Sequence, residues 1–153
     1  MKDLALTIRD GRSEDCAEVL RMIKDLAAFE KEPNAVIVTE DQLKRDGFSE
    51  HPRFHLKVAQ VNEGVVGMAL YYFAYSTWKG SYLYLEDFYV DPAYRGKGIG
   101  KALFESVIDV AKASKVKRMG WQVLDWNETA IAFYKRYDAD LSDEWLNGRL
   151  YFE

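Results

Sequence analysis

The fold of this chain is decided by residues 83–113, LYLEDFYVDPAYRGKGIGKALFESVIDVAKA. The first eight residues are rich in aromatic and aliphatic side chains and predict a strand, which Pro92 ends because proline cannot donate to a β-ladder. From Lys101 on, apolar residues recur every three or four positions and predict one face of a helix: Leu103, Phe104, Val107, Ile108 and Ala111. A glycine-rich loop therefore joins a strand to the N-terminus of a helix.

This loop has the make-up of an anion-binding site. Free N–H groups and the positive end of the helix dipole lie at a helix N-terminus, and glycines let a phosphate approach the backbone. A dinucleotide-binding loop would need glycine where Lys101 stands, and a P-loop would need Ser or Thr where Ala102 stands. The spacing Arg95-x-x-Gly98-x-Gly100 instead matches the signature of the GNAT acyl-CoA N-acetyltransferases. The alternative is an ordinary glycine-rich turn with a surface arginine.

Length and composition indicate a single soluble domain, which we expect to span residues 1–153. Hydrophobic residues make up 48% and charged residues 30% of the chain, and we expect no membrane span and no signal peptide. Cys16 is the only cysteine, so no internal disulfide forms, which suits a cytoplasmic protein. The net charge of −4 argues against nucleic acid as a partner and suits a cationic substrate.

The rest of the chain predicts an α/β or α+β sandwich with a mixed, mostly antiparallel sheet and helices on both faces. Eight further elements are expected: a strand over 4–9, a helix with its N-cap at Ser13, a short helix from the capping box at Thr39 to Gly47, strands over 54–61 and 65–75, a strand over 118–124, a helix capped by Asn127, and a final strand over 149–152. Short turns join the three strands that lead to Val90, which is typical of a β-meander.

Two other kinds of active site are not supported. His51 and His55 have no cluster of further Cys or His residues around them, so we expect no metal. No G-x-S-x-G motif of a serine hydrolase occurs. Cys16 lies on the apolar face of its predicted helix, which favours core packing over a role as nucleophile.

Beyond the loop, the chain resembles the diamine (spermidine/spermine) N-acetyltransferases and the related thialysine N-acetyltransferases over nearly its whole length. The motifs that carry the resemblance are YLEDFYV at 84–90, RGKGIG at 95–100, DWN at 125–127 and FYK at 133–135. Tyr137-Asp138-Ala139 departs from that family, which usually has glycine in the middle position. The resemblance implies a GNAT fold, acetyl-CoA as acetyl donor, a small-molecule amine as substrate and a homodimer.

The resemblance also implies which residues bind acetyl-CoA. The backbone of Phe88, Tyr89 and Val90 would pair with the pantetheine arm. The pyrophosphate would be held by the loop residues Arg95, Gly96, Lys97, Gly98, Ile99, Gly100 and Lys101. Asn127 would contact the cofactor near the thioester, and Tyr134 would lie beside it as the general acid.

The same resemblance assigns the substrate side. Glu86 would lie in the amine channel, with Phe29, Glu30, Trp121 and Gln122 as further contacts. An alkylamine has a pKa near about 10 and must lose a proton before it attacks, and a carboxylate such as Glu86 can accept that proton. The neighbouring Asp87 would point to the opposite face of a regular strand unless a bulge intervenes.

These residues favour an acetyl-CoA-dependent N-acetyltransferase that acts on a small cation, either a thialysine- or lysine-like amino acid or a polyamine. We expect direct attack of the amine in a ternary complex. Two alternatives stay open: acetylation of a protein lysine or N-terminus, and a CoA-binding module without catalysis, against which the retention of Glu86 and Tyr134 argues.

Overall fold

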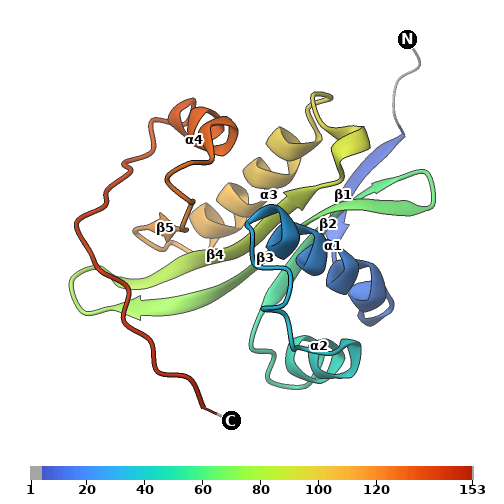
Figure 1. Cartoon of the computed structure of the whole chain (residues 1–153), viewed down its shortest axis with the longest axis horizontal. Helices are drawn as coiled ribbons and strands as arrows, with labels where there is room; N and C mark the ends of the chain where they lie inside the picture. Colours follow the sequence, from blue (N-terminus) through green and yellow to red (C-terminus); the bar gives the residue numbers. More distant parts are fainter. Residues whose placement is uncertain (1–4, 153) are drawn as a thin grey trace. The chain divides into compact units, whose positions relative to one another are not determined.

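A five-stranded sheet in the order β1-β2-β3-β4-β5 organises the chain up to Gln122 in the computed structural model, which describes residues 5–152 (Figure 1). The strands are β1 (Leu6–Asp10), β2 (His55–Val61), β3 (Gly64–Ser76), β4 (Gly80–Val90) and β5 (Met119–Gly120). Neighbours from β1 to β4 are antiparallel, and β5 runs parallel to β4. The predicted mixed, mostly antiparallel sheet is therefore confirmed; Leu4, at the start of the predicted first strand, lies outside the described residues.

Helices cover both faces of this sheet. They are α1 (Cys16–Phe29), α2 (Glu40–Gly47) and α3 (Ile99–Ala113), with short 3₁₀ turns η1 (Ser13–Asp15) and η2 (Pro92–Tyr94). Met22 of α1 packs in one core cluster with Tyr89 of β4. Phe104 of α3 lies 5.5 Å from Phe88, the residue before Tyr89, measured between ring centres. Because successive strand residues point to opposite faces, α1 and α3 lie on opposite sides, as predicted.

The starts of the first two helices differ in how well the sequence predicted them. Thr39 and Gln42 form the expected capping box, in which each backbone N–H donates to the other side chain over 2.8 and 3.2 Å. The first helix begins at Cys16, so the predicted N-cap at Ser13 is wrong. Asp15 accepts hydrogen bonds from the backbone of Arg12 and the side chain of Arg9, which holds residues 13–15 in a 3₁₀ turn.

The last predicted strands are shorter than expected or absent. β5 covers Met119–Gly120 and not 118–124, because it pairs with β4 at Leu83 and Tyr84 alone. Residues 149–152 form no strand, which corrects the prediction. Their apolar side chains at Leu150, Tyr151 and Phe152 are 83–89% exposed, so no burial on one face rewards strand formation there.

Residues 123–153 make a second compact unit that contains α4 (Glu128–Lys135). Asn127 caps this helix as predicted, since its side-chain oxygen accepts a hydrogen bond of 3.2 Å from the backbone of Ala130. The helix ends in a turn in which Ala139 N–H donates to Tyr134 C=O and Asp138 N–H donates to Lys135 C=O. Asp138 takes the left-handed conformation, with φ +56°. The aspartate thus adopts the backbone conformation that a glycine would favour.

Across residues 5–152, no helix has the length and apolar character that a membrane crossing requires.

Candidate active site

A β-bulge in β4 places two carboxylates on one face of the sheet. Leu85 pairs with Tyr71 and Asp87 pairs with Leu70, so Glu86 is an extra residue between two consecutive pairs. Leu70 packs in the cluster with α1, and Asp87 opposite it shares this face. Tyr72, two residues from Leu70, donates a hydrogen bond to Glu86 and so places this side chain there too. The bulge therefore brings Glu86 and Asp87 to the same side, which a regular strand would prevent.

Asp87 is the most strongly perturbed acid of this face. Its side chain is partly buried, and that burial raises its pKa from 3.8 to about 7, helped by the negative charges of Glu86 and Glu30. Glu30 follows the last residue of α1, and burial raises its pKa as well. The structure thus brings Glu86 and Glu30, both predicted from the sequence, together with Asp87, which had no predicted role. Its place beside Glu86 follows from the bulge, which the sequence does not predict.

Two tyrosines extend this acidic region along the sheet. The hydroxyl of Tyr72 donates to Oε2 of Glu86 over 3.3 Å, and the Tyr72 ring lies 5.5 Å from that of Tyr84 between centres. Burial, together with the charge and hydrogen bond of Glu86, raises the pKa of Tyr72 to about 12. Tyr72 therefore remains a hydrogen-bond donor well above neutral pH. Such aromatic faces beside carboxylates suit the alkyl chain and charge of an ammonium ligand.

The far half of β4 extends beyond its pairing with β5. Within the described residues β5 pairs with β4 only at Leu83 and Tyr84, although β4 continues to Val90. A strand edge of this kind can hydrogen-bond an extended ligand that carries amide groups. This arrangement fits the amides of a pantetheine arm at Phe88, Tyr89 and Val90, and the pairing itself stays a prediction.

The loop that follows β4 has the geometry of a phosphate cradle. Gly96 and Gly98 adopt φ of +75° and +81°, a conformation that favours glycine. A Cβ atom built on either residue meets no other atom within 4 Å, so open space lies over the loop. Gly98 is the N-cap of α3, and the next residue, Ile99, is buried and anchors the helix start. The residues present fit a pyrophosphate group.

Two cations of the loop contact nearby aromatic rings. Arg95 donates from Nε to the carbonyl of Val90 over 2.8 Å, and its guanidinium lies 5.3 Å from the centre of the Tyr89 ring. Lys97 lies 5.9 Å from the centre of the Tyr94 ring. The structure therefore holds the predicted Arg95 against the end of β4, directly before the glycines.

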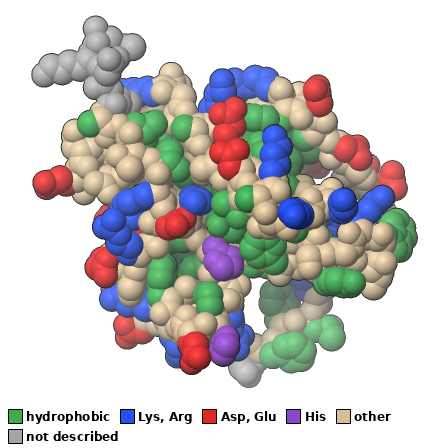
Figure 2. Space-filling model, turned by 180° about the vertical axis from the view of Figure 1, so that it is seen from behind, with side chains coloured by type: hydrophobic (Ala, Val, Ile, Leu, Met, Phe, Trp, Pro, Cys, Tyr) green, Lys and Arg blue, Asp and Glu red, His purple; other side chains and the backbone are tan. Residues whose placement is uncertain are grey.

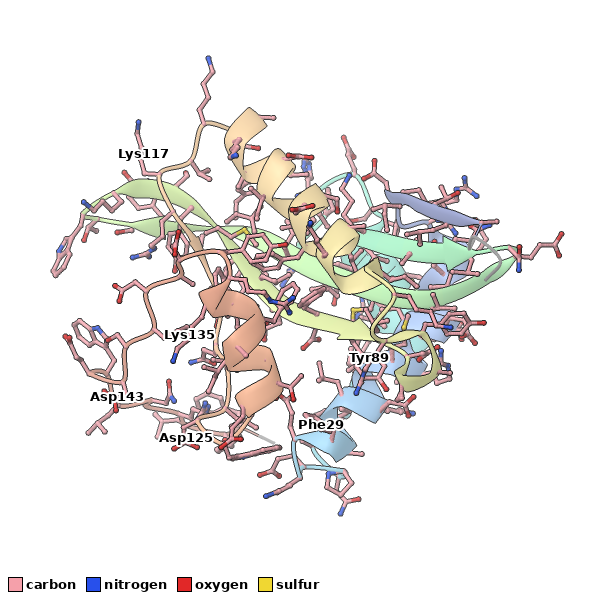
Figure 3. The ribbon with its side chains drawn as sticks, turned by 90° about the horizontal axis from the view of Figure 1, so that it is seen from above. Phe29, Tyr89, Lys117, Asp125, Lys135 and Asp143 are labelled. Atoms are coloured by element: carbon pink, nitrogen blue, oxygen red, sulfur yellow. The ribbon has the colours of Figure 1, made fainter. Side chains whose placement is uncertain are left out.

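The remaining predicted substrate contacts fall in different places. Phe29 is the last residue of α1, just before Glu30, and is 46% exposed; Figure 3 labels it at the helix end, with Tyr89 on β4. Trp121 instead lies against Phe104 of α3, with ring centres 5.5 Å apart, on the side of the sheet opposite to Glu86. Gln122 follows Trp121 directly. Their contacts with substrate stay predictions.

The predicted general acid belongs to the second unit. Tyr134 lies on α4, where its ring meets that of Phe133 edge-on at 5.5 Å between centres. Lys135, labelled in Figure 3, is the last residue of this helix. Asn127 at the N-cap and Tyr134 therefore share one helix, and their contacts with the cofactor stay predictions.

Both histidines are exposed and are visible on the face in Figure 2, where acidic and basic side chains are interspersed. Among residues 5–152, no three His, Cys, Asp or Glu side chains form a group that could hold a metal ion.

Comparison with known proteins identifies the family. The model of the acetyltransferase (GNAT) family matches residues 18–138. Thialysine N-epsilon-acetyltransferase of Mus musculus is 44% identical over 153 residues, which cover 93% of this chain and 90% of the mouse protein. Spermidine/spermine N(1)-acetyltransferase-like protein 1 of Homo sapiens is 41% identical over 145 residues, which cover 90% of this chain and 21% of the human protein.

A solved structure shows the same fold. The aminoglycoside acetyltransferase from an uncultured soil metagenomic sample, in complex with trehalose, superimposes with a TM-score of 0.78 at 18% identity and covers 97% of each chain. At this identity the likeness concerns the fold alone. The family match and the thialysine relative carry the assignment further: the chain belongs to the acetyltransferase (GNAT) family and is an N-acetyltransferase.

Proposed function

We propose that this enzyme transfers the acetyl group of acetyl-CoA to the primary amine of a small cation, either a lysine-like amino acid such as thialysine or a polyamine. The observation that carries the proposal is the bulge that sets Glu86 and Asp87 on one face, with the pKa of Asp87 raised to about 7. The names of the mouse and human relatives support this substrate class. We further propose that residues 1–153 act as one catalytic domain in a cytoplasmic homodimer.

The carboxylates serve to bind and deprotonate the amine. An alkylammonium has a pKa near about 10, so nearly all of it is charged at pH 7 and cannot attack. Glu86 attracts the cation, and the pair of Glu86 and Asp87 accepts its proton. A carboxyl with a pKa of about 7 suits this step, because it is substantially ionised at neutral pH and yet basic enough to hold the proton.

Acetyl-CoA supplies the acetyl group as a thioester. Residues 95–101, which form the loop and the first three residues of α3, bind its pyrophosphate, the β4 edge at 88–90 orients the pantetheine arm, and Asn127 contacts the cofactor near the thioester. In the transfer the amine nitrogen forms a bond to the acetyl carbon, and the bond from that carbon to sulfur breaks. The hydroxyl of Tyr134 gives its proton to the departing thiolate. The acetyl group passes directly to the amine in a ternary complex, without an acetylated protein residue.

Release of free thiol from acetyl-CoA tests this proposal. The panel contains thialysine, lysine, spermidine, putrescine and lysine-containing peptides, each at the same concentration and pH. We expect the small diamines or lysine-like amino acids to give the highest kcat/KM. Turnover of peptides alone would replace the proposal with a protein acetyltransferase. Binding of CoA without turnover of any amine would leave a CoA-binding module.

A further inference from the structure

Arg21 of α1 holds Asp91, the residue that follows β4, through two hydrogen bonds. Nη1 donates to Oδ1 over 3.1 Å and Nη2 donates to Oδ2 over 3.0 Å, so the guanidinium and the carboxylate meet side by side. The Asp91 side chain is 19% exposed, and the two residues are 70 positions apart in the chain. The pair therefore joins the first helix to the end of the central strand.

Asp91 links the sheet to the short turn that leads into the glycine-rich loop. Its N–H donates to the carbonyl of Val66 on β3 over 2.8 Å, and its own carbonyl accepts from Tyr94 N–H over 2.9 Å. The loop begins at Arg95, the residue that follows Tyr94. β3 thus fixes the backbone of Asp91, Arg21 fixes its side chain, and η2 extends from it to the loop.

The charges around Arg21 show that Asp91 is not needed to neutralise it. Glu18 and Asp25, both on α1, also lie 3.0 Å from the guanidinium. A third carboxylate just ahead of a loop that binds an anion would repel phosphate if it were left unpaired. The ion pair with Arg21 reduces this repulsion and holds the Asp91 side chain in place ahead of the loop.

We propose that Arg21 and Asp91 are positioning residues for acetyl-CoA: the ion pair sets the place and direction of the loop that begins at Arg95 and leads into α3. The inference rests on the proposed function, because it needs this loop to bind the pyrophosphate. Neither residue touches the cofactor in this proposal. They act through the backbone that presents Gly96 and Gly98.

Calorimetric titration with CoA tests the pair, because it needs no amine substrate. Arg21→Met, Asp91→Asn and the double variant are compared with wild type at a temperature where thermal melting shows each to be folded. If the pair positions the loop, each single change weakens CoA binding by about tenfold, and the double variant is no weaker than the worse single one. The KM for acetyl-CoA should rise in parallel, while the KM for the amine stays unchanged.

A purely electrostatic effect gives the opposite pattern. Loss of the positive charge in Arg21→Met would weaken CoA binding, loss of the negative charge in Asp91→Asn would strengthen it, and the two effects would add. Arg21→Lys keeps the charge but not the two-pronged geometry, so positioning predicts weaker binding and a charge effect predicts none. Asp25→Asn is the matched control, because it removes a partner of Arg21 that is not attached to the loop.

Two further outcomes separate this inference from the proposed function. If the variants melt at lower temperature but bind CoA as wild type does, the pair only stabilises the fold and the inference is wrong. If wild type binds no CoA, the proposed function fails and the inference fails with it.

Discussion

The hydroxyl of Tyr72 on β3 donates to Oε2 of Glu86, 3.3 Å away on the bulged residue of β4. We expect Tyr72→Phe to lower kcat/KM for the amine by about tenfold, because a hydrogen bond to a charged group is worth about 1.5–3 kcal/mol and less where it is exposed. Combined with Glu86→Gln it should add little. Steady-state kinetics measure both. Tyr75→Phe, on an exposed tyrosine of the same strand, is the control. Equal loss in both tyrosine variants would remove the hydrogen bond from the mechanism.

Asp87 should set the acidic limb of the pH profile. Only the ionised carboxylate accepts a proton, so kcat/KM for the amine should rise with pH through about 7, the pKa of Asp87. Asp87→Asn should lower the rate by about 10²–10⁴-fold and abolish this limb. Profiles measured from pH 5 to 9 check the expectation. If the rise of kcat/KM near pH 7 persists unshifted in Asp87→Asn, the ionisation of another group causes it.

The same carboxyl has a consequence for stability. Its pKa is raised from 3.8 to about 7 by burial and by Glu86 and Glu30, so the folded protein favours the protonated form. The stability that the folded protein gains from protonation of Asp87 is fully present below about pH 4, and it is lost as the pH rises through about 7. Asp87→Asn should therefore raise the free energy of unfolding at pH 8 more than at pH 4, by at most about 4 kcal/mol. Urea titrations at the two pH values measure this, with the exposed Asp109→Asn as control. A difference independent of pH would contradict the raised pKa.

Two substitutions at one glycine separate backbone strain from ligand repulsion. Gly98 has φ +81° and open space around its missing Cβ, so Gly98→Ala and Gly98→Asp impose similar backbone strain. Only the aspartate adds a negative charge where the pyrophosphate is proposed to bind. We expect calorimetry to show little or no acetyl-CoA binding for Gly98→Asp and measurable binding for Gly98→Ala. Equal affinities of the two variants would place the phosphates elsewhere.

Tyr134 and Tyr137 form a matched pair for testing the general acid. Both rings lie against Phe133, at 5.5 and 5.4 Å between centres, so each tyrosine-to-phenylalanine change keeps similar packing. Tyr134→Phe should lower kcat by about 10²–10⁴-fold without weakening acetyl-CoA binding. Tyr137→Phe should leave kcat close to wild type. Turnover at the wild-type rate in Tyr134→Phe would exclude Tyr134 as the acid.

Cys16 should take no part in the transfer. It is buried at the first position of α1, and this burial raises the pKa of its thiol, so little of it is the reactive thiolate at neutral pH. Cys16→Ala should keep most of the activity, and two-substrate kinetics should give intersecting lines. Parallel lines together with an acetylated Cys16 in the mass spectrum would establish an acetyl-enzyme instead.

Features set by neighbours in the sequence were predictable. The capping box of Thr39 and Gln42 needs residues three positions apart and forms as expected. The glycine-rich loop joins a strand to a helix as expected, and its residues Gly96 and Gly98 take positive φ angles. In both cases the local chain contains everything that determines the conformation.

Features set by distant partners were not predictable. The bulge depends on how β4 pairs with Leu70 and Tyr71, and without it Asp87 would face away from Glu86. Likewise, the apolar residues at 149–152 have the composition of a strand but form none in the structure. The sequence therefore predicted Glu86 and Glu30 but not Asp87, whose pKa both of their charges raise.

The bulge also makes Glu86 dispensable to the architecture that carries it. Tyr71 already has Leu85 as its partner and Leu70 already has Asp87, so the ladder would close without Glu86. Deleting this residue would leave Phe88 on the side of α3 and Tyr89 on the side of α1, where they now lie. Glu86 is thus a one-residue insertion, and the residues before and after it alternate as they would without it. The reactive surface and the hydrophobic core can in this way vary independently of each other.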